Sequence, residues 1–119
     1  MDTTLVLPWP PSVNAYYRSV NRGRLAGRVL ISERGRAYRA EVQAIVERRG
    51  MNPMQGRLTV HITANPPDRR RRDLDNLLKA TLDGLAHAGV FEDDSQIVDL
   101  RIYWAKDLGG MLKVKVSEV

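Results

Sequence analysis

Residues 58–88 read LTVHITANPPDRRRRDLDNLLKATLDGLAHA, and this stretch decides the fold. Its first part, residues 58–64, alternates apolar and polar side chains, which predicts a half-buried β-strand because successive residues of a strand face opposite sides. The two prolines that follow end the strand. Leucines then recur at spacings of three and four, which predicts an amphipathic helix over residues 74–88. Strands that alternate with helices favour a sheet layered against helices.

The segments on either side predict one more helix and four more strands. Ser32 is a good N-cap for a helix over residues 33–49, and Gly50 supplies the stop signal. Short apolar or alternating runs predict the strands, at residues 3–7, 28–31, 98–104 and 112–116.

The connections complete the predicted architecture. We expect residues 12–25 to form a loop or a flexible hairpin, and the last two strands to pair as a hairpin. The resulting order is β-β-α-β-α-β-β. It predicts an α/β protein with a single small domain over residues 1–119, in which two main helices pack on a mixed β-sheet.

Length and composition exclude several classes of protein. The 119 residues fit one domain, and 43% hydrophobic with 28% charged residues is near the globular average. No apolar run approaches the roughly 20 residues that a membrane-spanning helix needs, and the first residues lack a secretory-signal pattern. The absence of cysteine favours a reducing cytosol, so we expect a cytoplasmic protein. The glycines form no phosphate-binding motif, so no nucleotide cofactor is expected.

Net charge points toward a polyanionic partner. The chain carries 19 basic and 14 acidic residues, a net charge of +5, with a sequence pI near 10.0. Four of the basic residues are consecutive, Arg69, Arg70, Arg71 and Arg72. Because neighbouring like charges repel, a loop that keeps four of them favours contact with the phosphates of nucleic acid.

Carboxylates flank this arginine run and suggest a metal site. Asp73 and Asp75 follow it directly, and Asp94 lies in the acidic loop after the leucine-rich helix. Two residues apart in a helix face nearly opposite sides, so Asp73 and Asp75 converge only if Asp73 precedes the helix in an extended or cap conformation. If Asp94 joins them, the three could hold one or two Mg²⁺ ions, which prefer carboxylate and phosphate oxygens. Lys79, one turn beyond Asp75, could then stabilise charge on a phosphate.

Ordinary structural roles remain open for the same residues. An aspartate just before a helix is most often an N-cap, and one in the first turn favours the helix dipole. Asp75 and Lys79 could form a simple i, i+4 ion pair, worth about 0.2–0.5 kcal/mol.

The chain resembles the RusA family of Holliday junction resolvases, found in bacteria and their prophages. The resemblance rests on three motifs, LPWPPS with Asn14 and YYR at residues 7–18, PDRRRRDLDNL with Lys79-Ala80 at residues 67–80, and Asp93-Asp94 with QIVD at residues 93–99. It implies a homodimeric, Mg²⁺-dependent endonuclease, with Mn²⁺ as a possible substitute. Such an enzyme resolves four-way DNA junctions by paired symmetric nicks during recombination and repair.

The resemblance also implies roles for individual residues. Asp73, Asp75 and Asp94 are the implied metal-binding and catalytic acids, and Lys79 assists them. The implied DNA contacts are Arg69, Arg70, Arg71 and Arg72 with Asn14, Tyr17 and Arg18. Two other functions stay open, a non-catalytic DNA-binding module such as a phage regulator and a ribonuclease that uses the same ions.

Overall fold

Two sheets and five helical segments make up residues 2–119, which the computed structural model describes; Met1 of the predicted domain lies outside the described residues. The elements are β1 (Asp2–Pro8), α1 (Val13–Tyr16), β2 (Tyr17–Ser19), β3 (Val29–Ile31), α2 (Glu33–Arg49), β4 (Leu58–Asn65), the 3-10 helix η1 (Leu74–Leu77), α3 (Leu78–His87), the 3-10 helix η2 (Asp94–Gln96), β5 (Ile97–Trp104) and β6 (Met111–Glu118).

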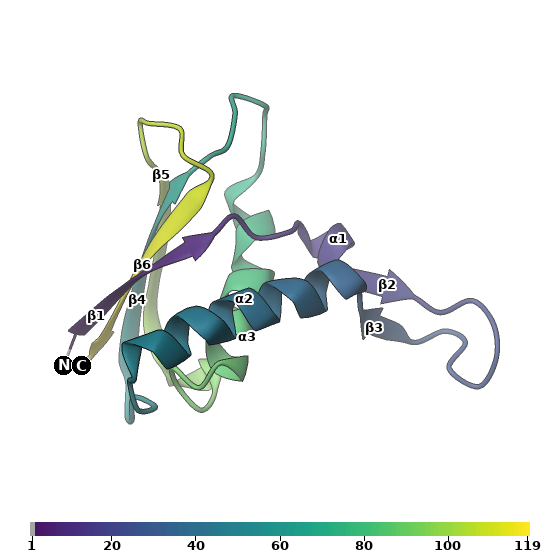
Figure 1. Cartoon of the computed structure of the whole chain (residues 1–119), viewed down its shortest axis with the longest axis horizontal. Coiled ribbons are helices and arrows are strands. Elements are labelled where there is room, and N and C mark those ends of the chain that lie inside the picture. The colour runs from purple at the N-terminus through teal and green to yellow at the C-terminus, as the bar shows by residue number, and fades with distance from the viewer. Residues whose placement is uncertain (1) are drawn as a thin grey trace.

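The main sheet is mixed and has the strand order β1-β6-β4-β5 (Figure 1). β4 pairs with β5 in parallel, whereas β6 runs antiparallel to both β1 and β4. The predicted mixed sheet with two main helices is therefore confirmed, but the predicted hairpin of the last two strands is wrong. α3 returns the chain so that β5 lies parallel to β4 at the sheet edge. β6, with Leu112, Val114 and Val116 fully buried, takes a central place.

One face of the sheet carries the core. Leu5, Leu58, Val60, Ile62 and Val114 are fully buried on this face, and α2 and α3 cover it (Figure 1). The opposite face is polar and carries Thr59, His61, Thr63, Lys113 and Lys115. This alternation is the period-two pattern that predicted the strands. No helix among residues 2–119 has both the length and the apolar character that crossing a membrane requires.

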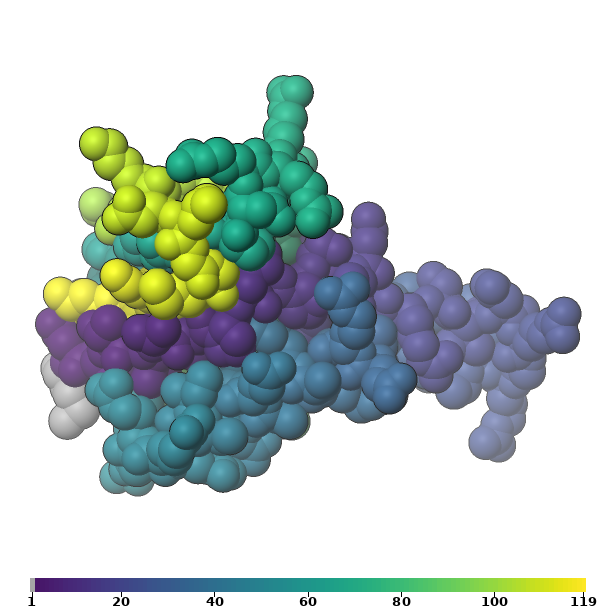
Figure 2. Space-filling view, turned by 45° about the horizontal axis from the view of Figure 1, so that its top comes forward, coloured from purple at the N-terminus to yellow at the C-terminus, as the bar shows by residue number. Residues whose placement is uncertain are grey.

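The predicted strand at residues 28–31 exists as β3, but it pairs with β2 in a separate two-stranded sheet. Together these strands and their connecting loop, residues 17–31, project from the body beyond the N-terminal end of α2 (Figures 1 and 2). We call this segment the β2–β3 arm. The short helix α1 before it was not predicted, since its four residues are too few for a periodic pattern.

The predicted helix signals hold with one modification. Ser32 caps α2 by accepting a hydrogen bond from the Gly35 amide, and Gly50 ends the helix in the left-handed conformation at φ 63°. The leucine-rich helix begins as the 3-10 turn η1 and becomes α-helical at Leu78.

Gly35 and Gly84 both lie where helices pack against other elements, but only Gly35 leaves no space for a side chain. A Cβ on Gly35 would lie 2.5 Å from the Tyr16 carbonyl oxygen and 2.8 Å from Ile31 Cγ2, so α1 and β3 press directly on the start of α2. A Cβ on Gly84 of α3 would lie 3.4 Å from Val42 Cγ2, which is an ordinary contact distance.

We therefore expect Gly35→Ala to lower the free energy of unfolding by about 1–3 kcal/mol, because the backbone of α1 must shift. Gly84→Ala is the matched control and should stay within about 1 kcal/mol of the parent protein, since alanine favours the helix by a similar amount. Urea unfolding with an unchanged slope measures both effects. Equal stability of the two variants would contradict the tight packing at Gly35.

Candidate active site

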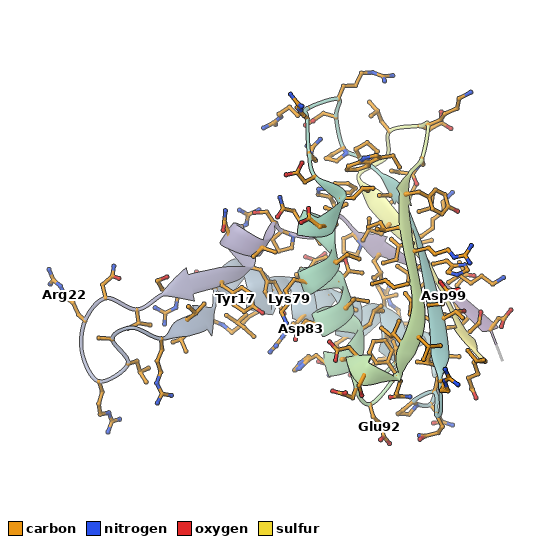
Figure 3. The ribbon with its side chains drawn as sticks, turned by 180° about the vertical axis from the view of Figure 1, so that it is seen from behind. Tyr17, Arg22, Lys79, Asp83, Glu92 and Asp99 are labelled. Atoms are coloured by element: carbon orange, nitrogen blue, oxygen red, sulfur yellow. The ribbon has the colours of Figure 1, made fainter. Side chains whose placement is uncertain are left out.

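A hollow of about 390 Å³ beside α3 gathers acidic side chains from two distant segments. Asp75 of η1 and Lys79 and Asp83 of α3 line it at spacings of four, so they share one side of the helical segment. Asp93 and Asp94 approach from the loop that leads into β5. We call this the acidic hollow. In Figure 3, Lys79 and Asp83 lie one after the other along α3, on the side toward the base of the arm.

The loop that carries Asp94 is held by its neighbours. Asp93 caps η2 by accepting a hydrogen bond from the Ser95 amide at 3.0 Å. Hydrogen bonds from the Ser95 side chain and from its amide lower the pKa of Asp93. Gln96 accepts from the Glu92 and Asp93 amides and donates to the Met54 and Gly56 carbonyls. Asp93 is therefore used in the turn itself, which leaves Asp94 as the carboxylate available to a ligand.

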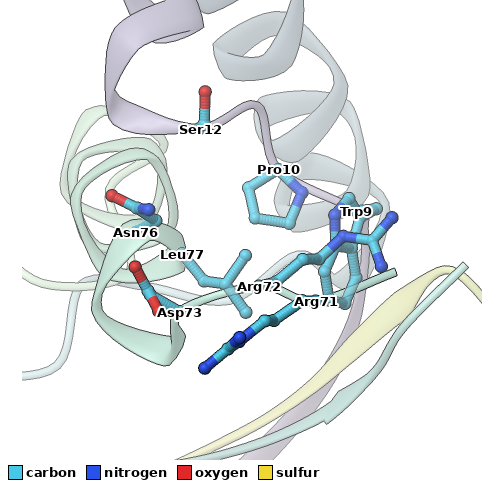
Figure 4. Close-up of a pocket in the computed structure, with 8 residues that line it drawn as sticks. All are labelled: Trp9, Pro10, Ser12, Arg71, Arg72, Asp73, Asn76 and Leu77. Atoms are coloured by element: carbon cyan, nitrogen blue, oxygen red, sulfur yellow. The ribbon is translucent and has the colours of Figure 1, made fainter. Parts of the chain in front are cut away.

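Asp73 occupies the cap position that the sequence required. It precedes η1 with an extended backbone, φ −97° and ψ 134°, and makes no side-chain cap bond. However, it lines a separate hollow of about 560 Å³, together with Trp9, Pro10, Ser12, Arg71, Arg72, Asn76 and Leu77 (Figure 4). The structure thus brings Asp75, Lys79 and Asp94 to one hollow and leaves Asp73 in another. Nowhere in residues 2–119 do three acidic or histidine side chains lie close enough to hold a metal ion.

The three predicted acids differ from most other aspartates in having no partners. Within the described chain, the side chains of Asp73, Asp75 and Asp94 make no hydrogen bond or ion pair, and all three are exposed. Lys79 also lacks an ion pair there, so its simple pairing with Asp75 is not formed. By contrast, Asp68, Asp83 and Asp99 are each paired with arginine. The unpaired acids keep their full capacity to accept a ligand.

Asp83 is held by two residues that sequence reasoning did not single out for function. The Tyr16 hydroxyl donates a hydrogen bond to Asp83 Oδ2, and Arg39 pairs with the same oxygen at 2.7 Å while donating to the Tyr16 hydroxyl at 3.0 Å. We call these three residues the Tyr16–Arg39–Asp83 cluster. It joins α1, α2 and α3 at the wall of the acidic hollow.

Charge and burial oppose each other in this cluster. Burial alone would raise the pKa of Asp83, but the hydrogen bonds from Tyr16 and Arg39, with the positive charges of Arg39 and Lys79, hold it below its ordinary value. Burial and the hydrogen bond to Asp83 raise the pKa of Tyr16 to about 12. The carboxylate is therefore the charged member opposite Arg39, and the phenol stays protonated as a donor.

The arginine run divides into a half-buried anchor, Arg72, and exposed members. Arg72 Nη1 contacts Asp68 Oδ1 at 2.8 Å, donates to the Asp68 and Arg70 carbonyls, and its guanidinium lies 5.7 Å from the centre of the Trp9 ring. Trp9 in turn stacks on Trp104 at 6.3 Å. Hydrogen bonds from the Arg72 side chain and from the Arg70 amide lower the pKa of Asp68 to about 2. Arg69, Arg70 and Arg71 remain exposed.

A third hollow, of about 320 Å³, lies between this loop and the turn after β5 and is strongly cationic. Besides Asp68 and all four arginines of the run, its lining includes Lys106 and Leu108. Of the predicted contacts in the first motif, Asn14 of α1 and Arg18 of β2 are exposed, and Tyr17 packs edge-to-face on Tyr16 at 5.0 Å. These residues lie at the base of the arm, in α1 and β2.

From the sequence, Asp83 was only a candidate for a surface residue or a supporting residue of the site, and Arg39, Tyr16 and Lys106 were missed. The spacing 75, 79, 83 along one helical segment could have indicated Asp83, because residues four apart share a helix face. No comparable signal exists for Arg39 and Tyr16, which reach Asp83 only through the packing of separate helices. Lys106 likewise meets the arginine run only through the tertiary fold.

Comparisons with known proteins identify a family and several similar relatives. Residues 8–117 match the family described as Endodeoxyribonuclease RusA. The chain is 43% identical to the crossover junction endodeoxyribonuclease RusA of Enterobacteria phage HK97, over 96% of this chain and 92% of that protein. It is 42% identical to the protein of the same name from Escherichia coli K12, over 98% and 94%. The corresponding protein of Enterobacteria phage 82 is 43% identical, over 97% and 93%.

The Tyr16–Arg39–Asp83 cluster predicts a pH-dependent stability. Because the pKa of Asp83 is lowered in the folded state, its contribution is complete above the unfolded pKa of about 3.9 and is lost as pH falls through the folded value. We expect Asp83→Asn to lower the free energy of unfolding at pH 7 by about 1–3 kcal/mol. The variant should also depend less on pH below about 4.

The control is Asp107→Asn, which alters an exposed carboxylate and should stay within about 0.5 kcal/mol. Urea unfolding at several pH values measures both variants. An acid limb that is unchanged in Asp83→Asn would contradict the charged state assigned to Asp83.

Proposed function

The chain belongs to the RusA family of endodeoxyribonucleases, and from this we propose which of its residues cut and hold a four-way DNA junction. It is a crossover junction endodeoxyribonuclease, a hydrolase that resolves Holliday junctions in recombination and repair. One observation carries the assignment of the active site. Asp75 and Asp94, far apart in the sequence, line one hollow with unpaired carboxylates, and Lys79 stands beside them.

The acidic hollow suits a hard divalent cation. Asp75 and Asp94 offer carboxylate oxygens, and Mg²⁺ often binds through one or two carboxylates together with substrate phosphate. We assign Mg²⁺ to these two residues, with Mn²⁺ as a substitute. When bound, the ion would supply an activated water and neutralise charge on the scissile phosphate. Asp73 is exposed and unpaired, so turning its side chain toward Asp75 breaks no hydrogen bond, and we assign it as the third ligand.

Lys79 has a separate role in this scheme. Its ammonium group lines the same hollow without an ion pair among the described residues. Placed against a phosphate, it stabilises the negative charge that develops on the oxygens during hydrolysis. Because Lys79 does not pair with Asp75 or Asp94, both carboxylates stay available to the ion.

DNA contacts are assigned to the exposed cations around the hollows. Arg69 and Arg71 are exposed and form no ion pair among the described residues, and Arg70 is exposed although its Nε lies 3.3 Å from Asp68 Oδ2. Lys106 adds to their positive field. Asn14, Tyr17 and Arg18 at the arm base extend the contact surface. Arg72 is held by Asp68 and Trp9, so we assign it to positioning the loop in which the other arginines lie.

Paired nicking also bears on the oligomeric state. Two strands of like polarity must each meet an acidic hollow, and a two-fold symmetric dimer presents two equivalent hollows. We therefore propose a homodimer, which light scattering tests.

Phage proteins among the relatives favour a phage or prophage source, and the cytosol is the compartment where such DNA lies.

Removing one acid should separate cutting from binding. Asp75→Asn, Asp94→Asn and Asp73→Asn should each lower nicking of a four-way junction with Mg²⁺ by more than about 100-fold, because loss of even an outer partner of a metal site often costs 10–100-fold. Junction affinity should be retained. Denaturing gels and mobility shifts measure the two properties.

Asp107→Asn is the control and should cut normally. Full nicking by Asp75→Asn or Asp94→Asn would refute the active site. No scission by the unaltered protein would instead favour a DNA-binding module without catalysis, and cleavage of structured RNA in preference would favour a ribonuclease.

The arginine run should divide into contacts and an anchor. Arg69→Ala should reduce the slope of log affinity against log salt by about 1, as expected for one lost phosphate contact, without changing the melting temperature. Arg72→Ala should lower the melting temperature, because it removes the Asp68 pair and the Trp9 stacking. A variant Arg72→Ala that melts normally yet loses about 1 from the salt slope would make Arg72 a direct contact.

A further inference from the structure

We propose that the β2–β3 arm is a second DNA-binding element, which lies against a duplex arm of the junction other than the one being cut. The inference rests on the proposed junction-cleaving function. It concerns Arg22, Arg24 and Arg28, which are neither part of the acidic hollow nor of the arginine run.

The arm is cationic without compensation. From Thr3 to Ser32 the sequence contains no aspartate or glutamate, while the arm itself carries Arg18, Arg22, Arg24 and Arg28. Residues 21–29 are all exposed. None of these four guanidinium groups has an ion-pair partner anywhere in residues 2–119. A segment with this charge attracts a polyanion and has no internal use for its arginines.

The shape of the arm fits a nucleic-acid groove. Its two strands pair Tyr17 with Ile31 and Ser19 with Val29, and the turn is closed by backbone hydrogen bonds between Val20 and residues 27 and 28. It extends along the 47 Å long axis of the molecule (Figures 1 and 3). The major groove, about 12 Å wide, admits a two-stranded ribbon, so arginines along such a ribbon can reach the phosphates that border the groove.

The base of the arm is fixed relative to the acidic hollow. Ser32 donates from its amide and from its hydroxyl to the Tyr16 carbonyl, at 2.8 and 3.0 Å. The side chain of Tyr16 then bonds Asp83, which lines the hollow. DNA held by the arm is therefore placed at a set position relative to Asp75 and Asp94.

A protein partner fits the arm less well than DNA. Leu25 and Val29 are its large exposed apolar side chains, at 42% and 61% exposure. Stable protein interfaces bury more than about 1,000 Å² with an apolar centre, which these two side chains do not provide. Two arms of this charge would also repel each other. Charge complementarity selects the phosphate backbone.

A second contact point explains selectivity for branched DNA. A four-way junction places a second duplex close to the strand in the acidic hollow. A linear duplex has no such second duplex for the β2–β3 arm to contact. Once one contact with the junction has formed, the second contact is intramolecular and forms at a high effective concentration, so the overall affinity for the junction rises strongly. The arm therefore strengthens junction binding more than duplex binding.

The test replaces the three arm arginines together, in Arg22→Ala/Arg24→Ala/Arg28→Ala. Binding is measured in EDTA to a synthetic four-way junction and to a linear duplex of equal total length, across a salt series. We expect junction affinity to fall about 10–100-fold and duplex affinity about 3-fold or less, with the junction salt slope reduced by about 2–3. Protection of the DNA backbone by the β2–β3 arm in hydroxyl-radical footprints should disappear from one duplex of the junction for each protomer bound.

Two controls keep the result specific. Arg48→Ala/Lys113→Ala/Lys115→Ala removes the same charge from exposed sites elsewhere and should leave the junction-to-duplex ratio unchanged. Arg22→Lys/Arg24→Lys/Arg28→Lys keeps the charge and should retain most of the affinity of the unaltered protein. Equal losses on junction and duplex, an unchanged junction affinity, or a change of oligomeric state instead of affinity would overturn the inference. Failure of the unaltered protein to cut junctions would overturn the proposed function, independently of the arm.

Discussion

The ion pair between Arg39 and Asp83 is the interaction on which the rest of the functional surface depends. It links α2 to α3, and the Tyr16 hydroxyl extends the link to α1 and the arm. α3 carries Lys79, and η1 directly before it carries Asp75. One partly buried cluster therefore fixes both the helix that presents the acidic hollow and the base of the projecting arm.

Local patterns predicted the elements well and their arrangement less well. Alternation and leucine spacing located β1, β4, β5, β6 and both main helices, because these patterns depend on neighbours along the chain. Strand order depends on competition among strands for the central places. β5 and β6 have similar alternation, but only β6 is buried between two neighbours, and nothing in either segment alone shows this. The charge pattern along the chain likewise identified Asp73, Asp75 and Asp94 as candidates, but only the tertiary structure shows that Asp73 lines a different hollow from the other two.

Identical neighbours in a sequence run take different parts in the structure. Arg72 holds its own loop against Asp68 and Trp9, and Arg70 also pairs with Asp68, whereas Arg69 and Arg71 are exposed and form no ion pair among the described residues. Asp93 and Asp94 divide in the same way, since the first caps η2 and the second stays unpaired. In both motifs one residue of a charged pair or run gives rigidity, and the residues beside it keep their charges for a ligand.

The strand order also has a consequence for biosynthesis. β1 is made before the other strands of the main sheet, yet within residues 2–119 it pairs there with β6, with Asp2 opposite Ser117 and Leu7 opposite Leu112. During synthesis β1 therefore lacks its neighbour in the sheet until residues 111–118 have been translated. Pairing between such distant segments carries a large loop-closure entropy and slows folding. The nascent chain can assemble β4, α3 and β5 first, and the main sheet is complete only when β6 inserts between β1 and β4.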